Sequence, residues 1–489
     1  MNDITAIFAF LRYCLGYKGD MSRVIIGMDW QELYSFASKQ AILGLCFEGI
    51  ERLGEEYPEE LKQNPIGREL LMTWMGKAQQ IRRQNMKVNA VAGKLFSMLR
   101  EDGLRCCILK GQGNALMYPN PYSRTPGDID VWINASRERI MEYAQKKFEL
   151  GDDIRLQHLE TSLDGVPVEL HFFPCSMNNP IYHARLQKWF RRNADLQCSH
   201  IVRLPDGAGD IAIPTMAFNV VYQLTHLYHH FFDEGIGMRQ IIDYFLVVND
   251  FSKNVFLDTD LSNHPVNFSN HPVPLSKEGS TFSPSPSSSG SGDVTAPSRC
   301  CICPTCPSPA GGSLTHSQAL ALSKRARDVT APTRCSEPLR SKDGGASKPS
   351  PGCAGWDRLD TTGDTSSVSC SSASTALDVV QRELKYLGLW KFVGAVMYVL
   401  HEALGLSEEK MIAPMDEKRG KLLLAEILNG GNFGRHFSKY GGFTHQSMGK
   451  KYFLKIWRNM HFVRYYPAEA LSEPIFRTWH FFWRVKNKK

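Results

Sequence analysis

Two aspartates separated by one residue, Asp128 and Asp130, are the strongest chemical signal in this chain. They open the run 128–133, whose remainder is apolar and alternates in the way typical of a β-strand. Since residues i and i+2 of a strand point to the same face, the two carboxylates are expected to stand side by side. Adjacent carboxylates repel each other unless a cation lies between them, and hard oxygen ligands of this kind suit Mg²⁺. The sequence therefore predicts a Mg²⁺ site at the start of this strand.

Basic and glycine residues near this pair are suited to binding phosphate groups. An apolar run, Cys106–Leu109, ends at Lys110, and the turn opened by Gly111 would leave backbone N–H groups free for phosphate. Lys110 adds a point charge, and Arg124 adds a planar guanidinium that can hold two phosphate oxygens. The alternative for both side chains is ordinary surface charge.

A predicted hairpin supplies a third carboxylate. Strands are predicted over Arg155–Leu163 and Val166–Phe173, because Asp164-Gly165 between them is a strong signal for a two-residue turn. The second strand places Glu169 and His171 on one face, where His171 either orients Glu169 or packs as a buried side chain.

The combination of Lys110-Gly111, Arg124 and Asp128-Ile129-Asp130 before an apolar strand resembles the uncharacterised nucleotidyltransferase family of the DNA-polymerase-β-like superfamily. The strand Val168–His171 resembles the strand that carries the third carboxylate of that family. The resemblance covers most of residues 25–250 and 377–485. The broad superfamily usually has Gly-Ser or Gly-Gly after its first strand, where this chain has Gly111-Gln112.

The resemblance implies a Mg²⁺-dependent enzyme that moves a nucleoside monophosphate from an NTP to an acceptor hydroxyl or amine. Three carboxylates would be catalytic and bind two Mg²⁺ ions, with the last completing the metal site or acting as base: Asp128, Asp130 and Glu169. Three groups would bind the NTP: Lys110, Gly111 and Arg124. The acceptor stays open, although a small molecule or a polysaccharide precursor is favoured over protein or tRNA. Such acceptors suit a cytoplasmic bacterial enzyme.

The hydrophobic pattern predicts an α+β fold, with a small mixed β-sheet flanked by N-terminal and C-terminal helical regions. Apolar residues recur every three or four positions in Trp30–Leu53 and Leu70–Leu99, which is typical of helices packed on a sheet. Five segments are predicted in chain order: an N-terminal helical region at 1–104, the nucleotidyltransferase α/β core at 105–214, the first part of a helical region at 215–251, a disordered low-complexity insertion at 252–376, and the second helical part with a basic, aromatic tail at 377–489.

The predicted insertion differs from the rest of the chain in composition. It is rich in Ser, Gly and Pro, and it repeats itself, since residues 293–300 recur with one change as residues 328–335. A segment without hydrophobic periodicity cannot bury enough apolar surface to offset the entropy lost on ordering. The insertion is therefore expected to contribute little to any core.

Five residues of the predicted helix 215–250 have side chains that could act in a functional site, but structural roles are expected for them. His226, His229 and His230 are a possible metal site, since His226 and His230 are one helical turn apart on one face, but a packed, hydrogen-bonded cluster at the domain interface, outside the carboxylate core, is favoured. Arg239 and Asp243 are four residues apart, which favours an ion pair within the helix.

The composition of the whole chain excludes some classes of function and leaves others open. The 489 residues carry a net charge of +7, which permits phosphate-bearing ligands without indicating nucleic-acid binding. No secretory signal or membrane-spanning stretch is expected, but the basic, aromatic tail would allow contact with an anionic membrane surface or with RNA. Two other functions therefore remain: a nucleotide-binding module without transfer activity, and an RNA-associated protein that uses this tail.

Overall fold

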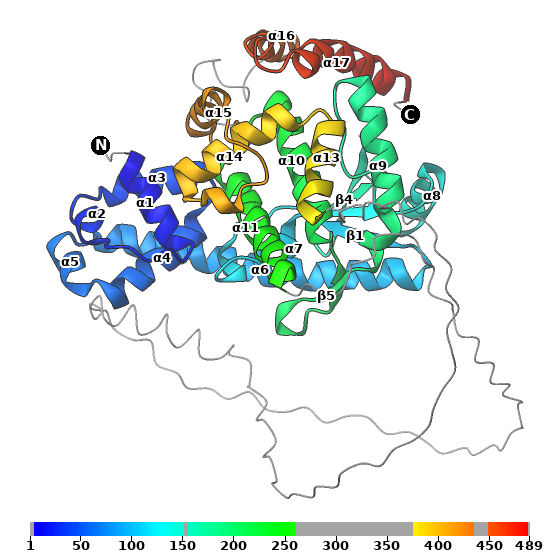
Figure 1. Cartoon of the computed structure of the whole chain (residues 1–489). Coiled ribbons are helices and arrows are strands. Elements are labelled where there is room, and N and C mark those ends of the chain that lie inside the picture. Colours follow the sequence, from blue (N-terminus) through cyan, green and yellow to red (C-terminus); the bar gives the residue numbers. More distant parts are fainter. Residues whose placement is uncertain (1–3, 151–154, 261–374, 435–447, 488–489) are drawn as a thin grey trace, which may run out of the picture. The chain divides into compact units, whose positions relative to one another are not determined.

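The computed structural model describes residues 4–150, 155–260, 375–434 and 448–487 (Figure 1). The described residues are mostly helical and include a small mixed sheet, which confirms the predicted α+β class. Six helices precede the sheet: α1 (Ile4–Cys14), α2 (Ser22–Ile26), α3 (Trp30–Lys39), α4 (Leu43–Glu56), α5 (Pro58–Gln63) and α6 (Arg68–Glu101).

The core alternates strands and helices in the order β1 (Cys106–Leu109), α7 (Gly111–Ala115), β2 (Ile129–Ile133), α8 (Arg137–Lys147), β3 (His158–Leu163), β4 (Val166–His171), α9 (Pro180–Ser199), β5 (Ile201–Arg203) and β6 (Asp210–Ala212). The later helices are α10 (Met216–Asp233), α11 (Met238–Asp260), α13 (Ala376–Tyr386), α14 (Trp390–Leu404), α15 (Glu417–Gly430), α16 (Met448–Met460) and α17 (Pro467–Asn487).

The main sheet has four strands in the order β1-β2-β4-β3. β2 is antiparallel to β1 and parallel to β4, and β3 and β4 form an antiparallel hairpin. The predicted Asp-Gly turn joins this hairpin, because Asp164 and Gly165 both adopt the positive φ that such a turn requires. The register places Asp130 beside Leu109 on one side and beside Glu169 on the other.

The two faces of this sheet are covered by different helices, and side-chain alternation decides which residue faces which helix. On β2, Ile129, Val131 and Ile133 pack with α6 residues in one apolar cluster. Trp132 faces the other way and stacks on Phe218 of α10, with ring centroids 6.1 Å apart. Asp130 shares the Trp132 face, because it lies two residues away. The sheet face that carries Asp130 is therefore the one that α10 covers.

The predicted boundary at residue 252 lies inside α11, which continues to Asp260. The helical chain resumes at Ala376, with Thr375 capping α13 through a hydrogen bond to the Asp378 backbone N–H. Residues 261–374, which make up most of the predicted insertion, lie outside the described residues. α13 and α14 pack against α10 and α11, so the helices on both sides of this interval form one layer.

Several basic side chains of the C-terminal tail are directed inward. Arg458 is fully buried and donates to the Phe231 carbonyl oxygen, while Lys455 and Arg477 both pair with Asp233 at the end of α10. This agrees with an amphipathic helical cap and leaves fewer tail charges for RNA than their number indicates. Among the helices described, none has an apolar stretch long enough to cross a bilayer.

Candidate active site

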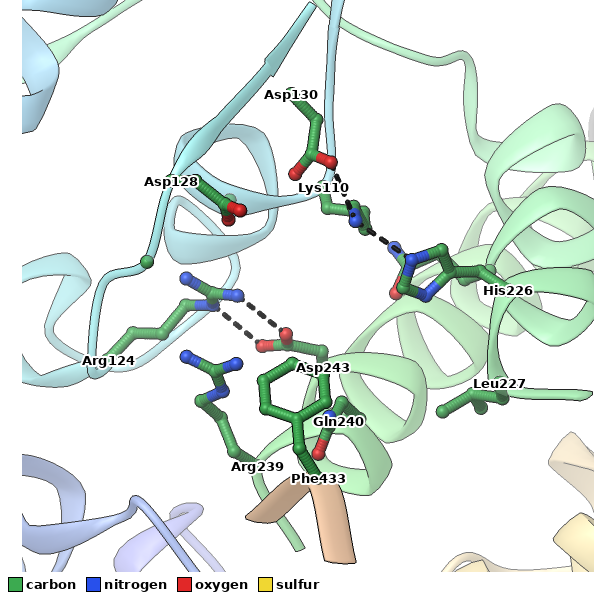
Figure 2. Close-up of a pocket in the computed structure, with 13 residues that line it drawn as sticks. Lys110, Arg124, Asp128, Asp130, His226, Leu227, Arg239, Gln240, Asp243 and Phe433 are labelled. Atoms are coloured by element: carbon green, nitrogen blue, oxygen red, sulfur yellow. Dashed lines mark hydrogen bonds and ion pairs between the residues drawn. The ribbon is translucent and has the colours of Figure 1, made fainter. Parts of the chain in front are cut away.

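Asp128 and Asp130 line one pocket together with Lys110 and Gly111 (Figure 2). Asp130 is buried in β2, and Asp128 is exposed just before the strand begins. The negative charge of Asp130 raises the pKa of Asp128 to about 6. Among the described residues, no basic side chain lies within ion-pair distance of Asp128. The two carboxylates therefore form a partly uncompensated negative site that a cation would stabilise.

Lys110 connects the carboxylates to α10. Its Nζ lies 3.0 Å from Asp130 Oδ1 and donates a hydrogen bond of 2.9 Å to His226 Nε2 (Figure 2). Burial disfavours the ammonium form, but the surrounding carboxylates outweigh burial and raise the pKa of Lys110. Burial also opposes the charged form of Asp130, yet Lys110 and His171 hold the pKa of that carboxyl below its usual value. In the structure, Lys110 is thus a charged neighbour of the carboxylate site.

The position of His226 corrects one expectation. The α10 histidines were expected outside the carboxylate site, but His226 lines the pocket and contacts Lys110 directly. Burial, together with the Lys110 charge, keeps the pKa of His226 well below its usual value, so its Nε2 serves as a neutral acceptor. His230 follows one turn later, with its Nε2 3.1 Å from that of His226. His226 therefore belongs to the site and contacts His230, whereas His229 borders a different cavity.

Glu169 and His171 share one face of β4, as predicted. His171 Nε2 lies 3.1 Å from Glu169 Oε2 and 3.1 Å from Asp130 Oδ1, so it bridges the two carboxylates. Burial opposes protonation of this imidazole, but hydrogen bonds to both carboxylates raise the pKa of His171 to about 9. This geometry favours orientation of Glu169 and Asp130 over simple packing as the role of His171.

Arg124 lines the same pocket but is already paired. Its Nε and Nη2 donate to the two oxygens of Asp243, at 2.9 and 2.8 Å, and both side chains are only 6% exposed. The predicted ion pair between Arg239 and Asp243 within α11 is therefore wrong, because the planar guanidinium of Arg124 holds both carboxylate oxygens. Arg124 Nη1 makes only a weak contact with the Thr125 carbonyl, at 3.5 Å, which leaves this end of the guanidinium for a ligand.

Arg239 and Phe433 are pocket residues that the sequence did not reveal. Arg239 Nη1 donates to the Thr125 carbonyl at 3.1 Å, and no carboxylate of the described residues lies within ion-pair distance of it. Burial and the nearby Arg124 charge lower the pKa of Arg239, and Figure 2 shows its guanidinium beside that of Arg124. Phe433 follows α15 with a φ of 55°, a conformation that a phenylalanine rarely adopts, and its ring lies under Arg239.

The turn after β1 has unusual backbone geometry. Lys110 and Gly111 have φ values of 52° and 41°, and positive φ in a non-glycine residue costs energy that functional sites often store. Gly111 lines the pocket, whereas the next residue, Gln112, is buried and donates to Asn89 of α6. Gln112, where this chain differs from the usual superfamily sequence, therefore packs against α6 and does not line the pocket.

Comparison with known proteins agrees with this geometry. Residues 27–262 match the model of a family described as uncharacterised nucleotidyltransferase, which confirms the resemblance for this part of the chain. The matched region includes all six residues predicted for the site, and it supports nucleotidyl transfer as the general chemistry. No curated protein matches the chain, and no solved structure does.

Proposed function

We propose that this chain, as its match to a nucleotidyltransferase family suggests, uses Mg²⁺ to transfer a nucleoside monophosphate from an NTP to an acceptor hydroxyl or amine. One observation carries the proposal: Asp128 and Asp130 face a pocket whose other charged residues are mostly cationic. Carboxylates and phosphate-binding cations meet at one place, which is the arrangement that phosphoryl chemistry requires.

The residues present fit Mg²⁺. Asp128 has no cationic partner among the described residues, and its raised pKa reflects unrelieved repulsion from Asp130. Glu169 is the neighbour of Asp130 on the parallel strand β4 and supplies a third oxygen donor. Asp128, Asp130 and Glu169 would hold the metal, and bound Mg²⁺ would neutralise charge on the triphosphate and on the departing pyrophosphate.

The chain's own cations would orient the NTP. Arg239, Lys110 and the free Nη1 of Arg124 border the pocket and would bind triphosphate oxygens. Lys110 would exchange its contact with Asp130 for a phosphate oxygen, while neutral His226 continues to accept its other proton. Phe433 presents an aromatic ring at the same pocket, where a nucleobase could stack.

The transfer step needs a base for the acceptor. The acceptor O–H or N–H loses its proton to Glu169, and its lone pair forms a bond to the α-phosphorus. The bond between the α-phosphorus and the bridging oxygen breaks, and pyrophosphate leaves with that electron pair. His171 would hold Glu169 in position through its 3.1 Å contact.

Labelled nucleotides test the proposal directly. The full chain is incubated with Mg²⁺ and each NTP carrying label at the α or the γ position, with sugar phosphates, polysaccharide precursors, tRNA or protein extract as acceptors. Appearance of the α label in a product, together with pyrophosphate release that Asp128→Asn lacks, supports transfer. Label from only the γ position would indicate a kinase or hydrolase. Nucleotide binding without pyrophosphate release would favour the inactive module, and tight RNA binding without transfer would favour the RNA-associated function.

A further inference from the structure

Two imidazoles and one carboxylate meet on the β3–β4 hairpin, next to the aspartates. His158 of β3 lies opposite His171 of β4 in the antiparallel register, and Glu169 precedes His171 by two residues on the same face. Glu169 Oε2 lies 3.1 Å from His171 Nε2 and 3.4 Å from His158 Nδ1. One ligand atom from each of the three residues lies within 4.8 Å of the others.

The two separations that involve Glu169 are those of ligands around one small ion. Two ligands that are each about 2.0–2.1 Å from a tetrahedral zinc ion lie roughly 3.3 Å from one another. Both measured contacts of Glu169 Oε2 are close to this separation. The two imidazoles need to approach each other by a modest side-chain rotation, which the cavity beside His158 leaves room for.

A second observation concerns the hydrogen bonds of His158. Its side chain is only 10% exposed, and both ring nitrogens are buried without a hydrogen-bond partner among the described residues. Its nearest acidic neighbours are Glu169 at 3.4 Å and Glu160 at 3.8 Å, and neither makes a hydrogen bond with it. Buried polar groups are normally satisfied, so an orphaned imidazole beside a carboxylate calls for a missing partner.

We propose that His158, Glu169 and His171 bind a transition-metal ion, with Zn²⁺ as the best match, at a site distinct from the aspartate pair. Imidazole nitrogens suit Zn²⁺ and similar ions, whereas Mg²⁺ prefers oxygen ligands alone. The site includes Glu169: its Oε2 would bind this ion, which leaves Oε1 for the acceptor proton or the Mg²⁺ ion of the proposed function. It does not depend on nucleotidyl transfer, since its argument rests only on these three residues.

The surroundings supply a route of entry. His158 lines a cavity of about 160 Å³ that also borders Gln157, Ser176 and His229. A three-ligand ion keeps an open coordination position, and this cavity can supply water or the acceptor to it.

A simpler explanation without a metal accounts for His171 but not for His158. In it, His171 bridges Asp130 and Glu169 through hydrogen bonds. That explanation leaves both nitrogens of His158 without a role, although β3 places this imidazole against the same carboxylate oxygen.

Cobalt binding tests the proposal, because four-coordinate Co²⁺ absorbs visible light and replaces Zn²⁺. The experiment uses the full chain without an affinity tag, in which four cysteines are changed to serine: Cys300, Cys301, Cys303 and Cys306. A chelator removes bound metal, and the protein is then titrated with Co²⁺ in excess Mg²⁺. One Co²⁺ per chain, a visible band and displacement by Zn²⁺ are expected. His158→Ala and His171→Ala should each weaken binding by on the order of 100-fold or more.

Three further variants make the outcome decisive. His183→Ala removes a half-buried histidine outside the cluster and should bind Co²⁺ like the parent. His158→Gln covers the case in which the alanine variant fails to fold, as judged by circular dichroism. Asp128→Asn should keep the cobalt band while losing transfer, which separates this site from the proposed function. Absence of the band from folded parent protein, or equal binding by the folded histidine variants, would overturn the proposal.

Discussion

Arg124 and Asp243, which are 119 residues apart in the sequence, form a bidentate ion pair that ties the loop before β2 to α11. The pair is buried, and Tyr118 donates a further hydrogen bond of 2.8 Å to Asp243 Oδ1. It therefore fixes the distance between the aspartate strand and the helix that carries Arg239. The pocket depends on this tertiary contact as much as on the strand that bears the carboxylates.

The first prediction concerns this pair. Asp243→Ala should lower the free energy of unfolding by about 3–5 kcal/mol, because it leaves the Arg124 guanidinium buried without its counter-charge. Urea unfolding followed by circular dichroism measures the loss. Glu142→Gln, which removes the exposed pair with Lys146, is the control and should change stability by less than about 0.5 kcal/mol. Equal stability of the two variants would contradict a buried, structural ion pair.

The second prediction is that substitution of either aspartate lowers activity, whereas the two substitutions differ in their effect on stability. Asp128→Asn and Asp130→Asn should each lower the transfer rate on the order of 10³-fold or more, because each removes an anionic oxygen from the proposed Mg²⁺ site. Asp130→Asn should also lower the melting temperature, since it breaks contacts with Lys110 and His171. Asp128→Asn should leave the melting temperature equal or higher, since it removes repulsion. Wild-type turnover by both variants would refute the site assignment.

The third prediction concerns Arg239. Arg239→Ala should raise KM for the NTP by roughly 10- to 100-fold, which corresponds to the loss of a charge-assisted hydrogen bond worth about 1.5–3 kcal/mol. Stability should not fall, because this buried guanidinium has no carboxylate partner among the described residues and is repelled by Arg124. Steady-state kinetics of pyrophosphate release measures KM, with the exposed Arg83→Ala on α6 as control. An unchanged KM would remove Arg239 from the nucleotide site.

The fourth prediction is a pH dependence of stability caused by Glu469. This side chain is buried at the start of α17 and accepts backbone N–H groups of Asn178 and Asn179, at 2.6 and 3.2 Å. Burial raises the pKa of Glu469 from 4.5 to about 7. The folded state therefore binds this proton more tightly than the unfolded chain. The resulting stability is present below pH 4.5 and is lost as the pH rises through 7, by about 3 kcal/mol in all.

Urea unfolding at pH 5 and pH 8 tests this dependence. Buried neutral histidines such as His230 act in the opposite direction, so the quantity to compare is the difference between wild type and Glu469→Gln. Relative to that variant, wild type should lose stability between pH 5 and pH 8. Glu417→Gln, at an exposed i, i+4 pair, should show no such difference. A parallel pH profile for wild type and Glu469→Gln would rule out the assigned pKa.

Local rules were sufficient for the carboxylate strands. The alternation in 128–133 and the Asp164-Gly165 turn depend on neighbours in sequence, and the structure has both elements where these patterns predict them. The faces of Glu169 and His171 follow from the same alternation. These parts of the site could be predicted because their geometry is set within a few residues.

The remaining pocket residues could not be predicted because long-range contacts decide their positions. The i, i+4 rule pairs Arg239 with Asp243, but in the structure the Arg124 guanidinium holds both Asp243 carboxylate oxygens. His226 reaches Lys110 only because α10 covers the sheet face that carries Trp132. Phe433 enters the pocket from a turn after α15, and no local pattern indicates that approach.

The pocket takes residues from both sides of the interval 261–374, since Arg239 comes before it and Phe433 after it. A chain divided within that interval would yield two polypeptides, the first with all the carboxylates and the second with the aromatic wall. Because α13 and α14 pack on α10 and α11, the two pieces have the complementary surfaces needed to reassociate. Residues 1–260 and 375–489 produced as separate chains are therefore expected to reassociate, and nucleotide binding at the proposed site would measure their reassociation.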